Sequence, residues 1–203
     1  MDSRYMVTHS LLSSWGYAMK DNPFEDATSE GDPMADFMKT LRREPIPTNE
    51  AMQNGIDFEN MVTDILAGVN PNHPWTDAAR AVATQIQGAK LQFKASKVVR
   101  IGNLDVLLYG RLDALKAGTI FDIKYTGNYD VGKYIDSTQH PMYFEIIPRA
   151  TSFVYLASNG TSVWPERYTR EESPDILVTV HQFFDWLNMT GLMDVYLRHW
   201  EAR

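Results

Sequence analysis

The stretch GRLDALKAGTIFDIKYTG, residues 110–127, determines how this chain is interpreted. Strand-forming residues lie on both sides of Ala117–Gly118, so the stretch predicts a β-hairpin with a tight turn. Asp113, Asp122 and Lys124 stand among these residues, although charges are usually kept out of sheet interiors unless they are paired or bind a metal. Because residues two apart in a strand face the same side, Asp122 and Lys124 project together, and the turn brings Asp113 beside them.

Two neighbouring carboxylates repel each other unless a cation or a proton lies between them. A divalent metal held by oxygen ligands satisfies both, and Lys124 could then orient or deprotonate a water molecule or stabilise a phosphate oxyanion. A purely structural alternative is open at this point. Asp113 and Asp122 could each pair with Lys124 or Arg111 at a sheet edge without any chemistry.

The segments around the hairpin predict helices before it and a mixture of elements after it. Helices are expected over 3–20, 34–44, 48–67, 76–87, 137–147 and from 174 to the end, and strands over 90–101, 104–116, 119–125, 150–158 and 161–168. Thr48 or Asn49, Thr76, and Ser137 or Thr138 are the expected helix caps. The order predicts one α/β domain with a mixed central sheet flanked by helices.

The composition restricts the chemistry. The 203-residue chain has no cysteine, which excludes disulfides, iron–sulfur clusters and thiolate zinc sites. Any metal must therefore be held by oxygen or imidazole, and oxygen favours Mg²⁺, Mn²⁺ or Ca²⁺. The net charge of −7 argues against a protein that coats nucleic acid by bulk charge, but carboxylates at a metal site contribute to that total and do not exclude a nuclease.

No apolar run approaches the length of a membrane span, and the first residues lack the charged-then-apolar order of a signal peptide. We therefore expect a cytoplasmic protein without a membrane partner.

Four short motifs in order carry a resemblance to a known family. GRLD and FDIKYTG resemble the paired strand motifs of the PD-(D/E)XK nuclease superfamily. Upstream, NGIDFENMV contains Gly55 and Glu59 in a Gly-x-x-x-(His/Glu) pattern, and downstream QHPMY contains Gln139 and Tyr143 in a Gln-x-x-x-Tyr pattern. Together they are similar to the RecB-like exonuclease branch, which includes CRISPR-associated and phage recombination members. The resemblance implies a restriction-endonuclease-like core.

The resemblance also implies roles at a metal site. Glu59, Asp113 and Asp122 would be the metal ligands, with the backbone carbonyl of Ile123 completing the coordination. Lys124 would position the attacking water and offset charge on the phosphate. Position 59 is Glu, where this branch often has His, and the carboxylate of Glu suits Mg²⁺.

Further residues are implied to contact DNA. Gln139 and Tyr143, one helical turn apart, would touch the strand end or the backbone near the scissile phosphate. Arg111 and Thr126 are weaker candidates for phosphate contacts, since each shares a strand face with a motif residue. Core packing is the alternative for Tyr143, and a surface charge is the alternative for Glu59.

The function implied is a Mg²⁺- or Mn²⁺-dependent deoxyribonuclease, an exonuclease by its branch, acting in phage or bacterial recombination, repair or defence. The domain would comprise an N-terminal helical elaboration (1–47), a nuclease core (48–170) and a C-terminal helical segment (171–203). DNA is the expected partner, together with a recombination, helicase or single-strand-annealing protein. A structure- or sequence-specific endonuclease acting in a complex, and an inactive module that binds DNA or protein, are the alternatives.

Overall fold

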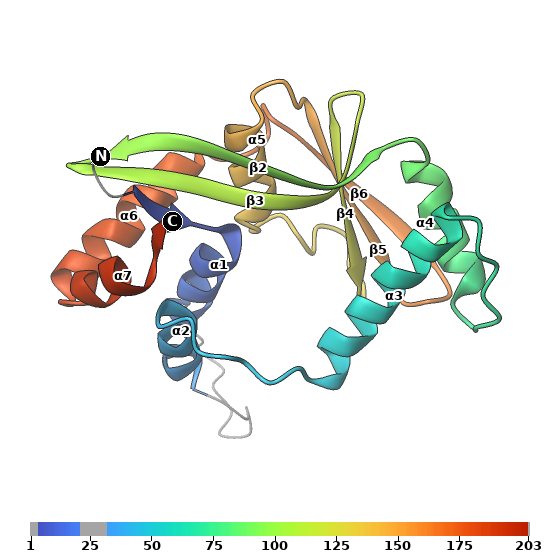
Figure 1. The fold of residues 1–203 in the computed structure, drawn as a ribbon, viewed down its shortest axis with the longest axis horizontal. Helices are drawn as coiled ribbons and strands as arrows, with labels where there is room; N and C mark the ends of the chain where they lie inside the picture. Colours follow the sequence, from blue (N-terminus) through green and yellow to red (C-terminus); the bar gives the residue numbers. More distant parts are fainter. Residues whose placement is uncertain (1–3, 21–31, 203) are drawn as a thin grey trace.

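The computed structural model describes residues 4–20 and 32–202 of the chain. Over these residues the protein is an α/β domain in which seven helices flank a mixed sheet of seven strands (Figure 1). The predicted fold class is therefore confirmed. No helix in these two ranges is long and apolar enough to cross a membrane.

The helices are α1 (His9–Ala18), α2 (Pro33–Leu41), α3 (Glu50–Leu66), α4 (Thr76–Ile86), α5 (Gln139–Ile146), α6 (Ile176–Met189) and α7 (Met193–His199). The strands are β1 (Arg4–Val7), β2 (Lys90–Ile101), β3 (Leu104–Lys116), β4 (Thr119–Tyr125), β5 (Ser152–Ser158), β6 (Val163–Thr169) and β7 (Glu201–Ala202). The strand order is β6-β5-β4-β3-β1-β7, with β2 paired to β3 off this path.

Strand β3 is the centre of the sheet, and its two edges are used differently. One edge pairs with β2 over nearly its whole length. The other edge pairs with β1 over residues 105–108 and with β4 over residues 114–116. In the sheet as described, residues 109–113 of this second edge have no strand partner, because β4 turns away to pair in parallel with β5. This unpaired edge of β3, residues 109–113, is called the gap below.

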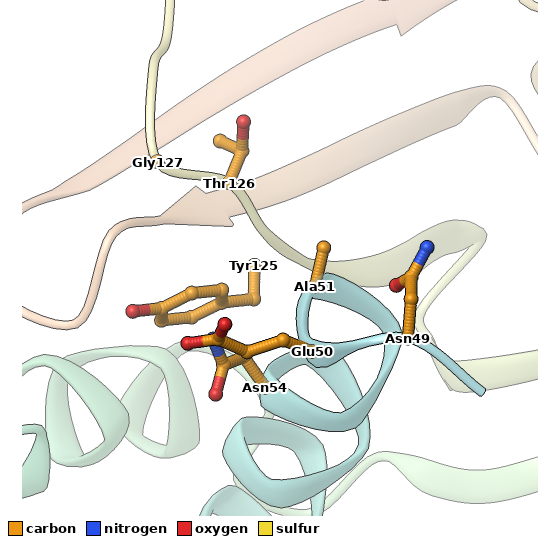
Figure 2. Close-up of a pocket in the computed structure, with 7 residues that line it drawn as sticks. All are labelled: Asn49, Glu50, Ala51, Asn54, Tyr125, Thr126 and Gly127. Carbon is orange, nitrogen blue, oxygen red and sulfur yellow. The ribbon is translucent and has the colours of Figure 1, made fainter. Parts of the chain in front are cut away.

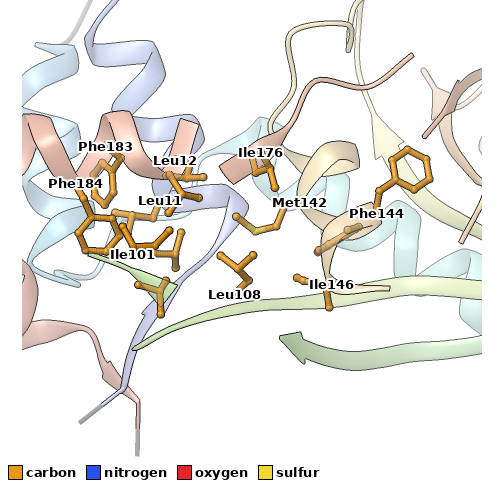
Figure 3. Packing of buried hydrophobic residues seen from close by; sticks show 14 of the residues in the cluster. Leu11, Leu12, Ile101, Leu108, Met142, Phe144, Ile146, Ile176, Phe183 and Phe184 are labelled. Atoms are coloured by element: carbon orange, nitrogen blue, oxygen red, sulfur yellow. The ribbon is translucent and has the colours of Figure 1, made fainter. Parts of the chain in front are cut away.

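Helices cover both faces of the sheet, and β5 shows the division. Phe153 and Tyr155 are buried on the face of α1, α2, α5, α6 and α7, whereas Val154 and Leu156 are buried against α3 and α4. Figure 3 shows the larger core, in which side chains of α1, α5 and α6 gather over Leu108 of β3. Each face buries its own apolar cluster, so the gap is approached by helices from both sides of the sheet.

The hairpin at the centre of the sequence interpretation has the predicted bounds. Its turn residues Ala117 and Gly118 have φ angles of 48° and 79°, as a two-residue turn between antiparallel strands requires. The expected cap Asn49 is confirmed, because its side chain accepts a hydrogen bond from Met52 N–H at 2.9 Å.

Three expectations about local structure are wrong. Residues 4–7 form strand β1 rather than the start of a helix, because pairing with β3 outweighs local helix preference. Thr76 is the first residue of α4 and not its cap, and its hydroxyl instead donates to Pro71 O at 2.9 Å. The C-terminal helix is interrupted near Gly191, whose φ of 72° ends α6, and the chain returns to the sheet as β7. Residues 21–31, between the first two expected helices, lie outside the described residues.

Candidate functional site

The two aspartates meet at the point where β3 and β4 separate. The last residue pair before the separation is Ala114↔Phe121, so the next position along each strand places Asp113 opposite Asp122. Asp113 Oδ2 accepts a hydrogen bond from the backbone N–H of Ile123 at 2.8 Å, in place of a strand-to-strand bond. The side chain of Asp113 is thus directed at the gap, beside Asp122.

Asp122 is buried and only partly satisfied. Its Oδ1 accepts a hydrogen bond from Gln139 Nε2 on α5. Lys124 Nζ lies 2.8 Å from Oδ2 as an ion pair, but Oδ2 has no hydrogen-bond partner of suitable geometry among the described residues. A buried carboxylate oxygen without a hydrogen bond is costly, and the Lys124 ammonium offsets that cost in part; a divalent cation at Oδ2 would offset it further.

Lys124 shares the face of Asp122, as the strand periodicity predicts. Burial of its ammonium group favours the neutral form, but Asp122, Asp113 and Glu59 outweigh burial and raise the pKa of Lys124 above its usual value. The side chain therefore carries a positive charge at neutral pH. This favours a role in orienting water or offsetting phosphate charge over the removal of a proton from water.

The surroundings of Asp113, by contrast, favour its neutral form. Burial, followed by the charges of Asp122 and Glu59, raises the pKa of Asp113 to about 8, against the lowering effect of the Ile123 N–H and of Lys124. Three carboxylates thus face one ammonium, which leaves an excess of two negative charges when all are ionised. This donor set of oxygens and this charge suit one divalent cation such as Mg²⁺ or Mn²⁺.

Glu59 reaches the site from α3, on the other face of the sheet. Its Oε1 accepts a hydrogen bond from Gln92 Nε2 at 2.6 Å. Gln92 lies on β2 and has a φ of 48°. The register of β2 and β3 places it opposite Asp113, although these two residues do not form a regular strand pair. Gln92 therefore holds Glu59 toward the site, a role that its sequence position did not suggest.

The three carboxylates do not form a closed cage. In the ranges 4–20 and 32–202, no three His, Asp or Glu side chains lie close enough together to hold a metal ion as they stand. Each of the three instead contacts a protein donor: Ile123 N–H for Asp113, Gln139 for Asp122 and Gln92 for Glu59. Coordination by all three would require these side chains to exchange a protein donor for the cation.

The backbone of Ile123 also takes part. Its N–H points at Asp113, and the N–H and C=O groups of one residue in an extended strand point to the same edge. The carbonyl of Ile123 is therefore directed toward the gap, as a fourth oxygen ligand would be.

Gln139 and Tyr143 lie together on α5, but both are buried. Gln139 donates to Asp122, and Tyr143 donates its hydroxyl to the carbonyl oxygen of Arg111 at 3.0 Å, satisfying one backbone group of the gap. Their exposed fractions are only 4% and 2%, so in this structure they support the site from within the core. The contact with DNA that the resemblance implies for them stays a prediction.

The remaining two candidates are placed differently. Arg111 is exposed on β3, two residues before Asp113, where a phosphate could reach it. Thr126 is engaged within its own loop, since its hydroxyl donates to Asn128 O at 2.7 Å and accepts from Lys133 Nζ at 2.6 Å. Lys133 Nζ also donates to Asn128 O at 2.5 Å, so its ammonium group is bound to the same loop.

An open pocket lies directly after the catalytic candidates on β4. It has a volume of about 670 Å³ between Tyr125–Gly127 and the first turns of α3, Asn49–Asn54 (Figure 2). Figure 2 shows the Tyr125 ring beside the side chains of Glu50 and Asn54. The lining residues that the structure describes include two amides, two hydroxyls and a carboxylate but no lysine or arginine, so the pocket suits polar base edges or sugars better than phosphate.

Sequence reasoning missed two titratable groups. His9, at the start of α1, packs against Tyr143, and burial lowers its pKa to about 4, with Lys124 lowering it further and Asp122 opposing. Glu166 on β6 is buried and accepts hydrogen bonds from the hydroxyls of Tyr129 and Tyr168 and from Tyr134 N–H. Neither residue lies in a motif, and no local pattern could have found them.

Comparison with known proteins gives support for the fold alone. No family model and no curated protein matches this chain. Among solved structures, one titled "Crystal structure of SSO0001" matches with a TM-score of 0.53 and 11% sequence identity, covering 93% of this chain and 78% of that one. The chain thus shares its overall arrangement of helices and strands with a solved protein that is very different in sequence.

Proposed function

We propose that this protein is a Mg²⁺- or Mn²⁺-dependent deoxyribonuclease, acting as an exonuclease. The observation that carries the proposal is the pair Asp113 and Asp122 at the gap, with an Asp122 oxygen that lacks a hydrogen bond and Lys124 at its side. The exonuclease form rests on the sequence resemblance of the four motifs to the RecB-like branch. The structural match supports the fold and not the activity.

The side chains divide the work as follows. Asp113, Asp122, Glu59 and the Ile123 carbonyl would hold the divalent cation, which when bound would polarise a phosphate oxygen and make a water molecule more acidic. Lys124 offsets negative charge on the phosphate and orients the water. Gln139 fixes the orientation of Asp122 through its hydrogen bond, so the ligand is preorganised.

The test is a cleavage assay on end-labelled linear DNA and closed-circular DNA, with Mg²⁺ or Mn²⁺ and with EDTA as the metal-free control. The Lys124→Ala variant runs beside the wild-type protein, and Lys39→Ala is the matched control because Lys39 pairs with Asp36 on the exposed surface of α2. We expect metal-dependent trimming of linear DNA by the wild type and by Lys39→Ala, and none by Lys124→Ala.

Two other outcomes would change the assignment. Nicking of closed circles would indicate an endonuclease on the same site. Absence of cleavage with both metals, together with absence of saturable Mn²⁺ binding by calorimetry, would favour a binding module. That alternative is compatible with the hydrogen bonds that the three carboxylates already make to protein donors.

A further inference from the structure

The topology of the sheet brings the start of α1 to the gap. Strand β1 runs parallel to β3, and its last residue, Val7, is paired with Leu108. The chain therefore leaves the sheet at the point where the unpaired edge of β3 begins. Thr8 caps the helix by accepting a hydrogen bond from Leu11 N–H at 3.2 Å, and His9 is the first helical residue.

His9 is fixed from two directions by the segment that supports Asp122. Its backbone carbonyl accepts a hydrogen bond from the Thr138 hydroxyl at 3.1 Å. Its imidazole lies edge-on against Tyr143, with ring centroids 5.7 Å apart and planes at 76°. Thr138 directly precedes Gln139 and Tyr143 lies one helical turn after it, so the imidazole is positioned together with the side chain that holds Asp122.

The ring of His9 has polar capacity that the protein does not use. Its Nε2 lies 3.4 Å from the exposed Ser10 hydroxyl, a long contact, and no other hydrogen bond of the ring is found in the described part of the chain. The residue keeps part of its surface exposed to solvent, so it is not enclosed in the core. A neutral imidazole offers one N–H donor and one lone pair.

We propose that His9 is a substrate-contacting residue, which donates a ring N–H to an oxygen of the DNA phosphate held beside Lys124. The inference rests on the proposed function and deepens it. It assigns to α1, outside all four motifs, a direct contact with the substrate strand. A hydrogen bond from a neutral ring adds to phosphate affinity without adding a charge beside Lys124.

The test measures DNA affinity separately from cleavage. A fluorescently labelled oligonucleotide is titrated with the protein by anisotropy, with Ca²⁺ in place of Mg²⁺ to suppress hydrolysis. His9→Phe keeps a ring against Tyr143 but removes the donor, and we expect its dissociation constant to rise about tenfold, the value of a hydrogen bond to a charged group. His9→Gln, which retains an N–H donor, should recover most of the affinity. His181→Gln, on the exposed surface of α6, is the matched control and should bind as the wild type does.

Mn²⁺ titration of the same variants distinguishes the alternatives. Unchanged Mn²⁺ affinity in His9→Phe, together with weaker DNA binding, supports the phosphate contact. A loss of Mn²⁺ affinity would overturn it and make His9 a metal ligand. Wild-type DNA affinity in His9→Phe would overturn this inference alone, whereas a wild-type protein that neither binds nor cleaves DNA would overturn the proposed function with it.

Discussion

In the part of the chain that the structure describes, buried carboxylates occur in two regions, around Asp122 and at Glu166, and the two are satisfied very differently. Glu166 accepts from Tyr129 at 2.7 Å, from Tyr134 N–H at 3.1 Å and from Tyr168. Burial acts to raise its pKa, but these donors outweigh burial and lower it. Asp113 receives one backbone N–H, and burial with two neighbouring carboxylates raises its pKa to about 8.

Under the proposed function, the contrast is between a structural carboxylate and a metal-binding one. Glu166 ties the loop after β4 to β6 and needs no further partner. Asp113 has a raised pKa and Asp122 has an oxygen without a hydrogen bond, an unfavourable arrangement that the proposed metal site would explain. A divalent cation is the partner that we propose for these two carboxylates, and the predictions below test the contrast from its largest consequence to its smallest.

Asp122→Asn should reduce cleavage by at least about 10²-fold, the scale on which the loss of one well-placed electrostatic group acts. Glu166→Gln should stay within about tenfold of the wild type, because its carboxylate contacts only the protein. Both are compared by initial rates on end-labelled DNA. Equal losses in the two variants would remove the distinction between the two regions.

Glu166→Gln should instead lose stability, by about 2–3 kcal/mol, because a buried network of donors would lose its charged acceptor. For a chain of this size we expect a fall in Tm of about 5–10 °C. Thermal unfolding by circular dichroism measures it, with the exposed Glu171→Gln as control. An unchanged Tm would mean that the tyrosines do not depend on this charge.

Asp113→Asn should keep its stability and lose its response to metal. Asparagine resembles the protonated carboxyl and can still accept from Ile123 N–H, so Tm without metal should not fall. The wild type should gain about 2.7 kcal/mol at a Mn²⁺ concentration one hundred times Kd, and the variant should gain much less. A metal-induced rise in Tm that survives in Asp113→Asn would contradict the assignment of Asp113 as a ligand.

Gly110→Ala tests whether the site depends on the packing beneath it. A Cβ atom at this position would overlap the ring of Tyr143, which is itself fully enclosed. Such overpacking costs about 1–3 kcal/mol and would displace α5 from the gap. We expect lower Tm and weaker cleavage together, whereas Gly127→Ala, in open space, should change neither by much.

The smallest effect concerns pH. Because the pKa of Asp113 is raised to about 8, the carboxyl is protonated at pH 7 without metal, and a metal must displace that proton. Apparent Mn²⁺ affinity should therefore rise by about tenfold between pH 7 and 9 and level off above the pKa. Calorimetric titration across this range checks it, and a flat profile would indicate an ordinary carboxylate at position 113.

Sequence reasoning was most successful where short-range rules apply. The bounds of β3 and β4, and the meeting of Asp113, Asp122 and Lys124, follow from strand alternation and one two-residue turn. It failed where distant segments decide the structure. β1, for example, forms through its pairing with the edge of β3, about one hundred residues away in the sequence.

The same limit applies to the supports of the site. The hydrogen bond from Gln92 to Glu59 depends on an unusual backbone angle in a strand that otherwise reads as regular. His9 and Glu166 lie 104 residues before and 53 residues after Asp113 in a chain without any local pattern that links them. Their places follow from the path of the sheet, which composition and periodicity do not specify.

The pairing of β1 with β3 has a consequence for the order of folding. Arg4 pairs with Asp105, so β1 can form only after a strand about one hundred residues later in the chain has been synthesised. Contacts of such long sequence separation form slowly, since the intervening loop must first close. The hairpin can form early from local contacts, but His9 reaches it only when β1 joins the sheet. A refolding experiment should therefore find that substrate affinity returns after most of the hairpin structure.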